Sequence, residues 1–414
     1  MHAVIVDGDV SYPPTSGKRL RTLHLMLRLA ERHQVTYIAR CEALGGESRQ
    51  AKEFLGDHHI EPILVDQPLP SKKGLRFYGR LAANLASAWP YSVTSHQGAN
   101  MRAAVHDYAA GHDVDLWQFE WSAYLPTLSR DTPGSRLLIA HNVDTLIWQR
   151  YYETARGFAK RLFLKQQWRR FERFERWAFG QADGVVAVSP EDAALVRDHF
   201  GQPNVDVVEN GIDRAYFEGV SGRRDPRRIL FLGALDWRPN QDAVHLLLDT
   251  IFPQVLAQEP QARLVLVGRN PAEALVRRVA ALPQVELHAN VPDVRPFLAE
   301  SGVMTVPLRI GGGSRLKILE ALASGLPVVS SRIGAEGLCL RPGEHYTLDE
   351  PDMAAALVQA LRQPEAAQKM ARKGRELVLE TYDWDTLANK LETIWERMTY
   401  DHRTPDGLAV FRGS

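Results

Sequence analysis

Cysteine is almost absent from this chain of 414 residues, which contains only Cys41 and Cys339. The two form no C-x-x-C pair, so a disulfide framework and a cysteine-based zinc knuckle are excluded, and a reducing, cytoplasmic compartment is expected. Long hydrophobic runs are also missing, because no apolar stretch reaches the roughly 18 residues of a membrane-spanning helix. No basic segment followed by an apolar stretch opens the chain, so no signal peptide is expected.

A net charge is missing as well, because 50 Lys and Arg balance 50 Asp and Glu. We therefore expect no nucleic-acid partner. Neither G-x-x-x-x-G-K-[ST] nor a G-x-G-x-x-G after a first strand occurs, which disfavours P-loop and dehydrogenase chemistry. No His/Cys cluster has zinc spacing. Asp7-Gly8-Asp9 and Asp113-Val114-Asp115 match the D-x-D pattern of metal-dependent sugar transfer, but that pattern is short and common. We expect no metal and no cofactor.

What the chain has instead is a regular alternation of short apolar runs with longer amphipathic stretches, which is typical of parallel sheets wrapped by helices. The predicted strands are residues 3–7, 34–39, 60–65, 114–119, 136–141, 184–188, 205–209, 229–233, 263–268, 285–288, 303–307 and 327–330. The predicted helices include residues 18–32, 190–200, 241–258, 271–281, 294–300, 314–324 and 384–398. The fold class is therefore α/β.

A segment rich in Gly, Arg and Pro, residues 218–228, interrupts the alternation and is interpreted as a linker. It separates a lobe at 1–217 from a second at 229–380, and residues 381–414 hold a last helix and a tail. We expect two Rossmann-like lobes that face each other across a cleft, with the last helix crossing back to the first lobe. Ligands of such sheets bind at the carboxyl ends of the strands.

The strongest local signal is the sequence PLRIGGGSRLKILEA, in which three glycines separate a strand from a helix. Gly312 and Gly313 let backbone N–H groups approach an anion, and Ser314 is a candidate helix cap. Arg315 and Lys317 lie in the first turn, where the helix dipole disfavours cations unless an anion is bound there. The sequence therefore predicts a phosphate cradle; the alternative is an ordinary glycine loop with two solvated cations.

Three further loops follow strands of the second lobe, FLGALDWRPN, VGRN and HANVPD. Together they predict a nucleotide site, in which an arginine pairs with phosphate and a flat base lies against backbone. The expected contacts are Gly233, Arg238, Gly268, Arg269, Asn290 and Val291. Glu320, farther along the helix after the glycines, can accept both hydroxyls of a ribose; the alternative is a surface glutamate.

In the first lobe, Gly17 stands at a helix start where its backbone can meet a diphosphate or an acceptor. His141 ends a strand and can hydrogen-bond a sugar hydroxyl, or is simply a structural histidine. Residues 157–179 and 71–80 mix basic and aromatic side chains. They fit an anionic membrane surface on its inner, cytoplasmic face or a lipid-linked acceptor, or else the aromatics pack into the core.

These motifs make the chain resemble a retaining glycosyltransferase of family 4 (glycosyltransferase group 1), with the GT-B fold. The resemblance covers nearly the whole chain. It is carried by the loop ending in Gly17, AHN at 140–142, ADGVVAVS at 182–189, VVENGID at 207–213, FLGALDWRPN, GGGSRLKILEALASGLPVV at 311–329 and TYDW at 381–384.

The resemblance implies metal-free transfer of a sugar from a UDP-, GDP- or ADP-sugar, with retention, to a glycan, lipid-linked or small-molecule acceptor. The first lobe would bind the acceptor and the second the donor. Glu320 matches the second glutamate of the family's pair, and Gly312 stands where the first would be. The N–H groups of Arg315 and Leu316 match the diphosphate cradle. The implied catalytic residues are His141, Arg238, Arg315 and Lys317.

Two other functions remain open from the sequence. A nucleotide-sugar epimerase can share the two-lobe plan but needs acidic and basic residues around the sugar C2, and no such set is evident. A non-catalytic nucleotide-sugar-binding protein would explain the glycine at 312.

Overall fold

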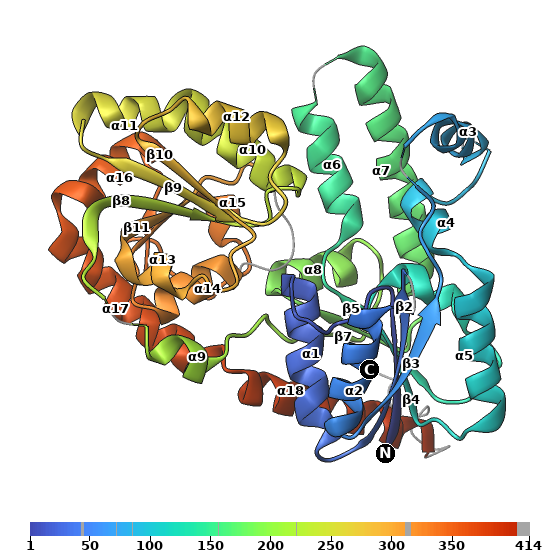
Figure 1. Cartoon of the computed structure of the whole chain (residues 1–414). Helices are drawn as coiled ribbons and strands as arrows, with labels where there is room; N and C mark the ends of the chain where they lie inside the picture. The colour runs from blue at the N-terminus through green and yellow to red at the C-terminus, as the bar shows by residue number, and fades with distance from the viewer. Residues whose placement is uncertain are drawn as a thin grey trace. The chain divides into compact units, whose positions relative to one another are not determined.

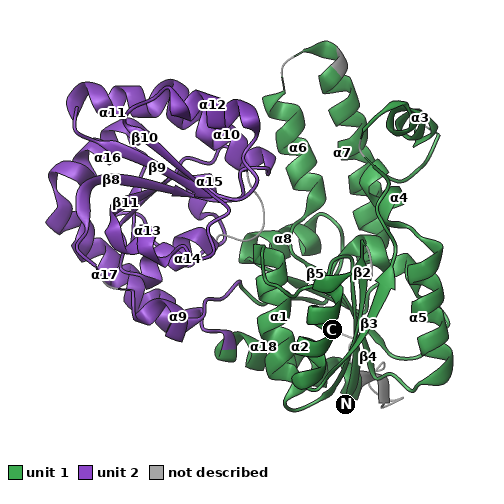
Figure 2. Ribbon diagram, in the orientation of Figure 1, with its two compact units in different colours: residues 1–209, 312–314, 385–414 green, residues 210–311, 315–384 purple. Residues whose placement is uncertain are grey.

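The computed structural model describes residues 1–42, 45–71, 73–84, 86–155, 157–220, 222–310 and 316–403. It divides the chain into two compact units (Figure 2). Unit 1 holds Met1–Glu209 and the residues from Asp385 on, whereas unit 2 holds the residues between Asn210 and Trp384. Each unit is built on a parallel sheet with helices around it (Figure 1). The predicted α/β class with two Rossmann-like lobes is confirmed.

The sheet of unit 1 has seven strands in the order β3-β2-β1-β4-β5-β6-β7, and every neighbouring pair is parallel. Its inner strand β1 (His2–Asp7) carries four consecutive apolar residues that are at most 1% exposed, as expected where helices cover both faces of a parallel sheet. The strands are β1 (His2–Asp7), β2 (Gln34–Cys41), β3 (Ile60–Asp66), β4 (Leu116–Phe119), β5 (Ser135–Ala140), β6 (Gly184–Ala187) and β7 (Val205–Val207).

The helices of unit 1 begin at recognisable caps. Ser189, for example, accepts a hydrogen bond from the Asp192 N–H, and Pro190 occupies the first turn of the helix that follows. The helices are α1 (Gly17–Ala30), α2 (Gly46–Asp57), α3 (Leu75–Asn84), α4 (Tyr91–His96), α5 (Ala99–Gly111), α6 (Asp144–Thr154), α7 (Phe158–Phe179), α8 (Pro190–Asp198) and α18 (Trp384–Arg403), with a 3-10 turn at Ser122–Thr127.

Unit 2 repeats the plan with six strands in the order β10-β9-β8-β11-β12-β13. The strands are β8 (Asp225–Leu232), β9 (Arg263–Gly268), β10 (Val285–Ala289), β11 (Ser301–Val306), β12 (Val328–Ser330) and β13 (Thr347–Leu348). The helices are α9 (Arg214–Glu218), α10 (Arg238–Leu246), α11 (Phe252–Gln258), α12 (Glu273–Ala280), α13 (Arg295–Glu300), α14 (Leu316–Ala323), α15 (Arg332–Ala335), α16 (Met353–Arg362) and α17 (Pro364–Thr381).

Both sheets reverse their strand order next to the first strand of the unit. In unit 1 the reversal separates β1 from β4, and in unit 2 it separates β8 from β11. In open α/β sheets, ligands bind outside the carboxyl ends of the strands at such a reversal. The topology therefore points to the loops after β1 and β4 in unit 1 and to those after β8 and β11 in unit 2.

Three sequence expectations need correction. The boundary between the units lies at Glu209/Asn210 rather than at 218–228, because Ile212 already donates to Tyr382 O and Tyr216 to Asp293, both in unit 2. The helix expected at 241–258 is two helices joined by a π-helical turn at Leu247–Ile251; Pro253, just beyond it, has no N–H to continue the α-helical pattern. The two-residue strand β13 was not anticipated.

The last helix packs on unit 1, as expected. The carbonyl of Met398 accepts a hydrogen bond from Ser135 Oγ, and Glu392 pairs with His33 across 2.7 Å. Its buried face carries Trp384, Leu387, Leu391, Ile394 and Trp395. Among the described residues, no helix combines the length and the apolar character needed to cross a bilayer.

Candidate functional site

In unit 2, two of the predicted phosphate motifs flank the reversal in strand order. Gly233 follows β8, and Lys317 lies in the first turn of α14, beyond β11. The Lys317 ammonium donates to Asn240 Oδ1 across 2.8 Å and lies 5.0 Å from the centre of the Phe231 ring. A Cβ added to Gly233 would come within 2.8 Å of that ammonium. The structure therefore brings Gly233 and Lys317 together at the edge where an anionic ligand would bind.

Gly268 has a packing role that the sequence did not reveal. A Cβ at this position would meet the carbonyl oxygen of Gly233 at 1.9 Å. The N–H of Gly233 donates to Val267 O across 3.0 Å, so the loops after β8 and β9 are tied together by main chain. Gly268 therefore lets the backbone around Gly233 sit against β9, instead of acting only as a ligand contact.

The loops after β9 and β10 are tied together by amide side chains. Asn290, with a positive φ of 54°, accepts the N–H of Asn270 at 2.9 Å through its Oδ1. Asn270 in turn donates to Asp236 in the β8 loop across 2.9 Å. Arg269 is half-buried and lies 3.9 Å from Asp236, and Val291 is half-buried next to Asn290. The predicted contacts of these loops thus lie on one connected rim.

Arg238 is the first residue of α10 and is half-buried, with Pro239 following it in the first turn. The same helix receives a bidentate ion pair, because Arg309 in the loop after β11 binds both oxygens of Asp242 at 3.0 and 2.7 Å. This ion pair therefore ties the loop after β11 to helix α10, which follows the loop after β8.

Glu320 lies on α14, one turn beyond Lys317, and is partly buried. Burial raises the pKa of its carboxyl to about 7, against the opposing charge of Lys317. No ion pair or hydrogen bond joins this carboxylate to another residue in the described part of unit 2. Its charge contributes to the raised pKa of Tyr216, whose hydroxyl donates to Asp293 at 2.9 Å. Glu320 is thus a costly carboxylate beside the predicted phosphate groups.

Four predicted residues of the glycine loop lie outside the described residues: Gly312, Gly313, Ser314 and Arg315. The described part of the helix begins at Leu316, which is buried. The phosphate cradle therefore stays a prediction.

In unit 1, the predicted histidine is held by a carboxylate that the sequence reading missed. His141 follows β5 and Glu120 follows β4, and His141 Nε2 lies 2.7 Å from Glu120 Oε2. Thr22 donates to the same oxygen at 2.7 Å, and Gln118 Nε2 donates to Glu120 Oε1 at 2.6 Å. Glu120 is 2% exposed. Its position directly after an apolar strand was the available signal.

Burial and charge act in opposite directions on this pair. Burial would raise the pKa of Glu120, but the hydrogen bond and charge of His141, with Lys18 and Thr22, lower it to about 2. Burial lowers the pKa of His141 more than the neighbouring carboxylate raises it. The structure therefore favours a neutral His141 that donates to an ionised Glu120 near neutral pH.

The loop between β1 and α1 pairs its own charges. Lys18 forms an ion pair with buried Asp7, and Arg19 binds both oxygens of Asp9 at 2.8 Å. Gly17, between Ser16 and these cations, is the first residue of α1. The second D-x-D sequence lies at the opposite edge of the sheet, where Asp115 accepts the N–H of His2. In the described part of the chain, no three side chains of metal-binding type gather at one place.

A buried carboxyl pair anchors the helix that follows His141. Glu175 of α7 accepts the N–H groups of Asp144 and Thr145, at 2.7 and 2.9 Å, at the start of α6. Burial, then the charge of Asp144, raises the pKa of Glu175 to about 8. Burial also raises the pKa of Asp144 to about 6, although Trp121 donates to it at 2.9 Å.

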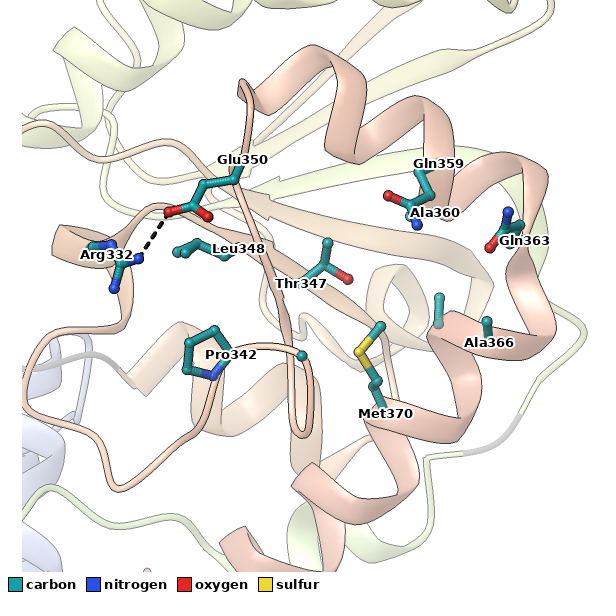
Figure 3. A pocket seen from close by; sticks show the side chains of 12 residues that line it. Arg332, Pro342, Thr347, Leu348, Glu350, Gln359, Ala360, Gln363, Ala366 and Met370 are labelled. Carbon is teal, nitrogen blue, oxygen red and sulfur yellow. Dashed lines mark hydrogen bonds and ion pairs between the residues drawn. The ribbon is translucent and has the colours of Figure 1, made fainter.

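A hollow of about 470 Å³ lies elsewhere in unit 2, beside the edge strand β13 (Figure 3). Thr347, Gln359 and Met370 line it, and Arg332 pairs with Glu350 at 2.8 Å on one side. It contains none of the predicted site residues, so we do not assign the donor to it.

Comparison with known proteins fits this arrangement. A family model described as "Glycosyltransferase Family 4" matches residues 17–216, and one described as "Glycosyl transferases group 1" matches residues 226–364. The chain belongs to glycosyltransferase family 4. A glycogen synthase of Mycobacterium tuberculosis is 25% identical over 246 residues, which cover 56% of this chain and 58% of that protein. The chain thus aligns with little more than half of that protein.

Solved structures share the fold of this family 4 chain. A sucrose-phosphate synthase from Thermosynechococcus elongatus has a TM-score of 0.70 at 18% identity, covering 97% of this chain and all of the other. HepE from Anabaena, in complex with UDP-glucose, has a TM-score of 0.64 at 17% identity, covering 96% of this chain and all of the other. Identities this low support the GT-B fold alone.

Proposed function

We propose that this chain is a glycosyltransferase that moves a sugar from a nucleotide-sugar donor to an acceptor, with unit 2 binding the donor. The observation that carries the proposal is the placement of Lys317 against Gly233 and Asn240 at the strand reversal of unit 2. A cation, a close-packed glycine loop and a helix start at one sheet edge suit a diphosphate. The UDP-glucose complex of HepE, a protein of the same fold, supports a donor of this class.

Each described group then has a role. The Lys317 ammonium pairs with the diphosphate, and Glu320 accepts the ribose hydroxyls. Because the pKa of Glu320 is about 7, the carboxyl is partly protonated without ligand, and two hydroxyl donors would favour its ionised form. Arg238 and the cradle at 312–316 complete the set by resemblance to the family. No metal takes part in this assignment.

The proposed chemistry is transfer with retention of configuration. The bond from the anomeric carbon to the diphosphate breaks, the bond to the acceptor oxygen forms on the same face, and the acceptor proton passes to the departing phosphate oxygen. Stabilising the departing charge is the main catalytic contribution. Support comes from Glu120, which accepts three hydrogen bonds and so is poorly placed to act as a nucleophile. By resemblance to the family, His141 would hydrogen-bond a sugar hydroxyl through Nδ1.

The test is a donor panel. The full chain is incubated with UDP-glucose, GDP-mannose and ADP-glucose, and release of each nucleoside diphosphate is measured. We expect one donor to be turned over, and Lys317→Ala to weaken binding of the matching diphosphate about tenfold or more. Lys369→Ala, an exposed lysine on α17, is the control. If Lys317→Ala left turnover and diphosphate affinity unchanged, the donor would not bind at the strand reversal of unit 2. The anomeric configuration of the product, read by NMR, tests retention.

For the acceptor side, we propose that unit 1 meets an anionic membrane surface through α3 and the start of α7. Large apolar side chains are exposed there: Leu75 is 90% exposed, Tyr78 66%, Phe158 85% and Leu162 60%. Figure 1 shows α3 beside α7, and Arg170 of α7 donates to Asn84 O at the end of α3 across 2.8 Å, so the two helices meet there. Patches of this kind mark interaction sites.

The charge of this surface selects the partner. Arg76, Lys160 and Arg169 are exposed on the same two helices. Basic and aromatic side chains together suit anionic headgroups. The alternative of core packing holds for the other half of α7, where Phe171 and Phe174 are each 1% exposed. An acceptor carried on a lipid would be presented at this surface.

Flotation with liposomes tests the surface. We expect the chain to float with phosphatidylglycerol vesicles and not with phosphatidylcholine vesicles, and the double variant Phe158→Ser/Leu162→Ser to stay in solution. Val276→Ser, which changes a 45% exposed side chain in unit 2, should float like the wild type. Equal flotation of the double variant and the wild type would contradict the assignment.

A further inference from the structure

A chain of buried hydrogen bonds runs from the last helix to His141. Trp395 Nε1 of α18 donates to Gln118 Oε1 of β4 across 2.8 Å, and Gln118 Nε2 donates to Glu120 Oε1 across 2.6 Å. The other oxygen of Glu120 lies 2.7 Å from His141 Nε2. Trp395, Gln118 and Glu120 are 0%, 3% and 2% exposed, so water has little access to compete for these bonds.

The indole of Trp395, the first group in this series of hydrogen bonds, can act only as a donor. An indole N–H is always a donor, whereas a glutamine amide can present either its oxygen or its nitrogen to a given neighbour. Because Trp395 Nε1 is buried against Gln118, the amide oxygen of Gln118 has to face it, and the amide nitrogen has to face Glu120. Trp395 thereby settles the orientation of Gln118, which a glutamine alone would leave open.

The same direction continues to the histidine. Glu120 receives a proton donor at Oε1 from Gln118, and at Oε2 it receives the hydroxyl of Thr22 and the ring of His141. A carboxylate only accepts, so the His141 proton lies on Nε2 when the ring is neutral. Nδ1 then keeps its lone pair and is the ring atom available to a hydroxyl of a bound sugar.

We infer that Trp395 and Gln118 are positioning residues, which fix the direction of the hydrogen bond at Glu120 Oε1, while the Glu120 carboxylate itself holds the ring of His141 as the Nε2–H tautomer. The inference rests on the proposed function for its consequence, namely that Nδ1 meets a hydroxyl of a bound sugar. It makes α18, the last helix of the chain, part of the construction of the site in unit 1. The hydrogen-bond direction itself does not depend on any substrate.

The substitution Glu120→Gln tests the direction of these hydrogen bonds through the tautomer of His141. With Trp395 in place, the amide of Gln118 still points its nitrogen at position 120, so the new side chain must accept there with its oxygen. Its own nitrogen then faces His141, which has to accept at Nε2 and carry its proton on Nδ1. We therefore expect Glu120→Gln to invert the tautomer. Adding Trp395→Phe frees both amides to turn together and is expected to restore a population of Nε2–H.

The full chain, labelled with ¹⁵N-histidine, is studied by NMR at about pH 8, where a histidine of ordinary pKa is neutral. His141→Asn assigns the resonances, and the other histidine signals report that each variant is folded. Trp395→Phe alone should keep the wild-type tautomer, because the Glu120 carboxylate still accepts.

Three results would overturn the inference. They are a wild-type His141 protonated on Nδ1, a Glu120→Gln variant that keeps Nε2–H, and a double variant whose tautomer matches that of Glu120→Gln alone. The first needs no substitution, so it remains decisive even if a variant fails to fold. Since no substrate is present, these outcomes are independent of the donor panel; loss of turnover in His141→Asn tests the proposed function separately.

Discussion

Replacing Glu320 with glutamine should stabilise the ligand-free protein increasingly as the pH rises. The pKa of this carboxyl is about 7 in the folded chain and 4.5 as its ordinary value. A folded-state pKa that is raised favours the protonated acid, so the cost of ionisation is absent well below pH 4.5 and complete above pH 7. For these two values the linkage relation gives a cost of about 0.8 kcal/mol at pH 5 and about 3 kcal/mol at pH 8.

The difference between the two pH values is the diagnostic quantity, because the buried amide of the variant has a cost of its own that does not vary with pH. Glu320 is partly exposed, and solvent screening reduces the full figure, so we expect the advantage of Glu320→Gln to grow by about 1–2 kcal/mol from pH 5 to pH 8. For a domain of 150–250 residues this corresponds to a gain of roughly 2–8 °C in Tm over wild type.

The assay is thermal unfolding of wild type and Glu320→Gln across this pH range, with and without the nucleoside diphosphate that the donor panel selects. Glu376→Gln, at an exposed carboxyl on α17, is the control. With ligand, the order should reverse, since a ligand stabilises the folded state it binds and the variant has lost the ribose acceptor. Parallel Tm curves for Glu320→Gln and wild type would refute the assignment of a costly carboxylate at this position.

Three further outcomes follow from the packing. Gly268→Ala should lower the Tm of the protein, at a cost of about 3 kcal/mol, because its Cβ would lie 1.9 Å from a carbonyl oxygen; Gly219→Ala, with open space around its Cβ, is the control for the same measurement. In Asp144→Asn, the decrease in Tm from pH 6 to pH 9 should be smaller than in wild type. The reason is that the negative charge of Asp144 helps to raise the pKa of Glu175 to about 8. Arg224→Ala should raise the susceptibility of the segment before β8 to proteolysis and cost about 2–3 kcal/mol in thermal unfolding, because three carbonyls lose their donor.

The sequence predicts the strands well because most of them are buried and read as short apolar runs. Residues 263–268 match β9 at both ends, and 34–39 lie within β2. Local pattern fails where the signal is short or depends on partners. β13 has two residues, and the unit boundary at Glu209 follows from contacts such as that of Ile212 with Tyr382 rather than from composition. The phosphate motifs could be predicted because glycine and cations share one loop.

The contact of His141 with Glu120 shows more clearly that local pattern cannot predict contacts between residues far apart in the sequence. The two residues follow different strands, and Gln118 and Trp395, which orient them, are 277 positions apart. No spacing rule connects such residues, because the strand order of the sheet brings them together only in the folded chain. A glutamate directly after an apolar strand was visible in the sequence, but nothing there distinguished a ligand of His141 from a solvated carboxylate.

The two units have the same strand order but differ in how charged groups are paired at the reversal, and this difference supports the proposed placement of the donor in unit 2. In unit 1 the charged groups satisfy one another: Asp7 with Lys18, Asp9 with Arg19 and Glu120 with His141. A dianionic diphosphate there would compete with carboxylates for Lys18 and Arg19, whereas a neutral hydroxyl can bind the remaining nitrogen of His141 at little cost. In unit 2, Lys317 donates to the amide oxygen of Asn240, and Glu320 lies one turn away with its pKa raised to about 7. Hydroxyl donors beside the glutamate would offset the cost of its charge, and a nucleoside diphosphate carries such hydroxyls together with phosphates that the Lys317 ammonium can bind.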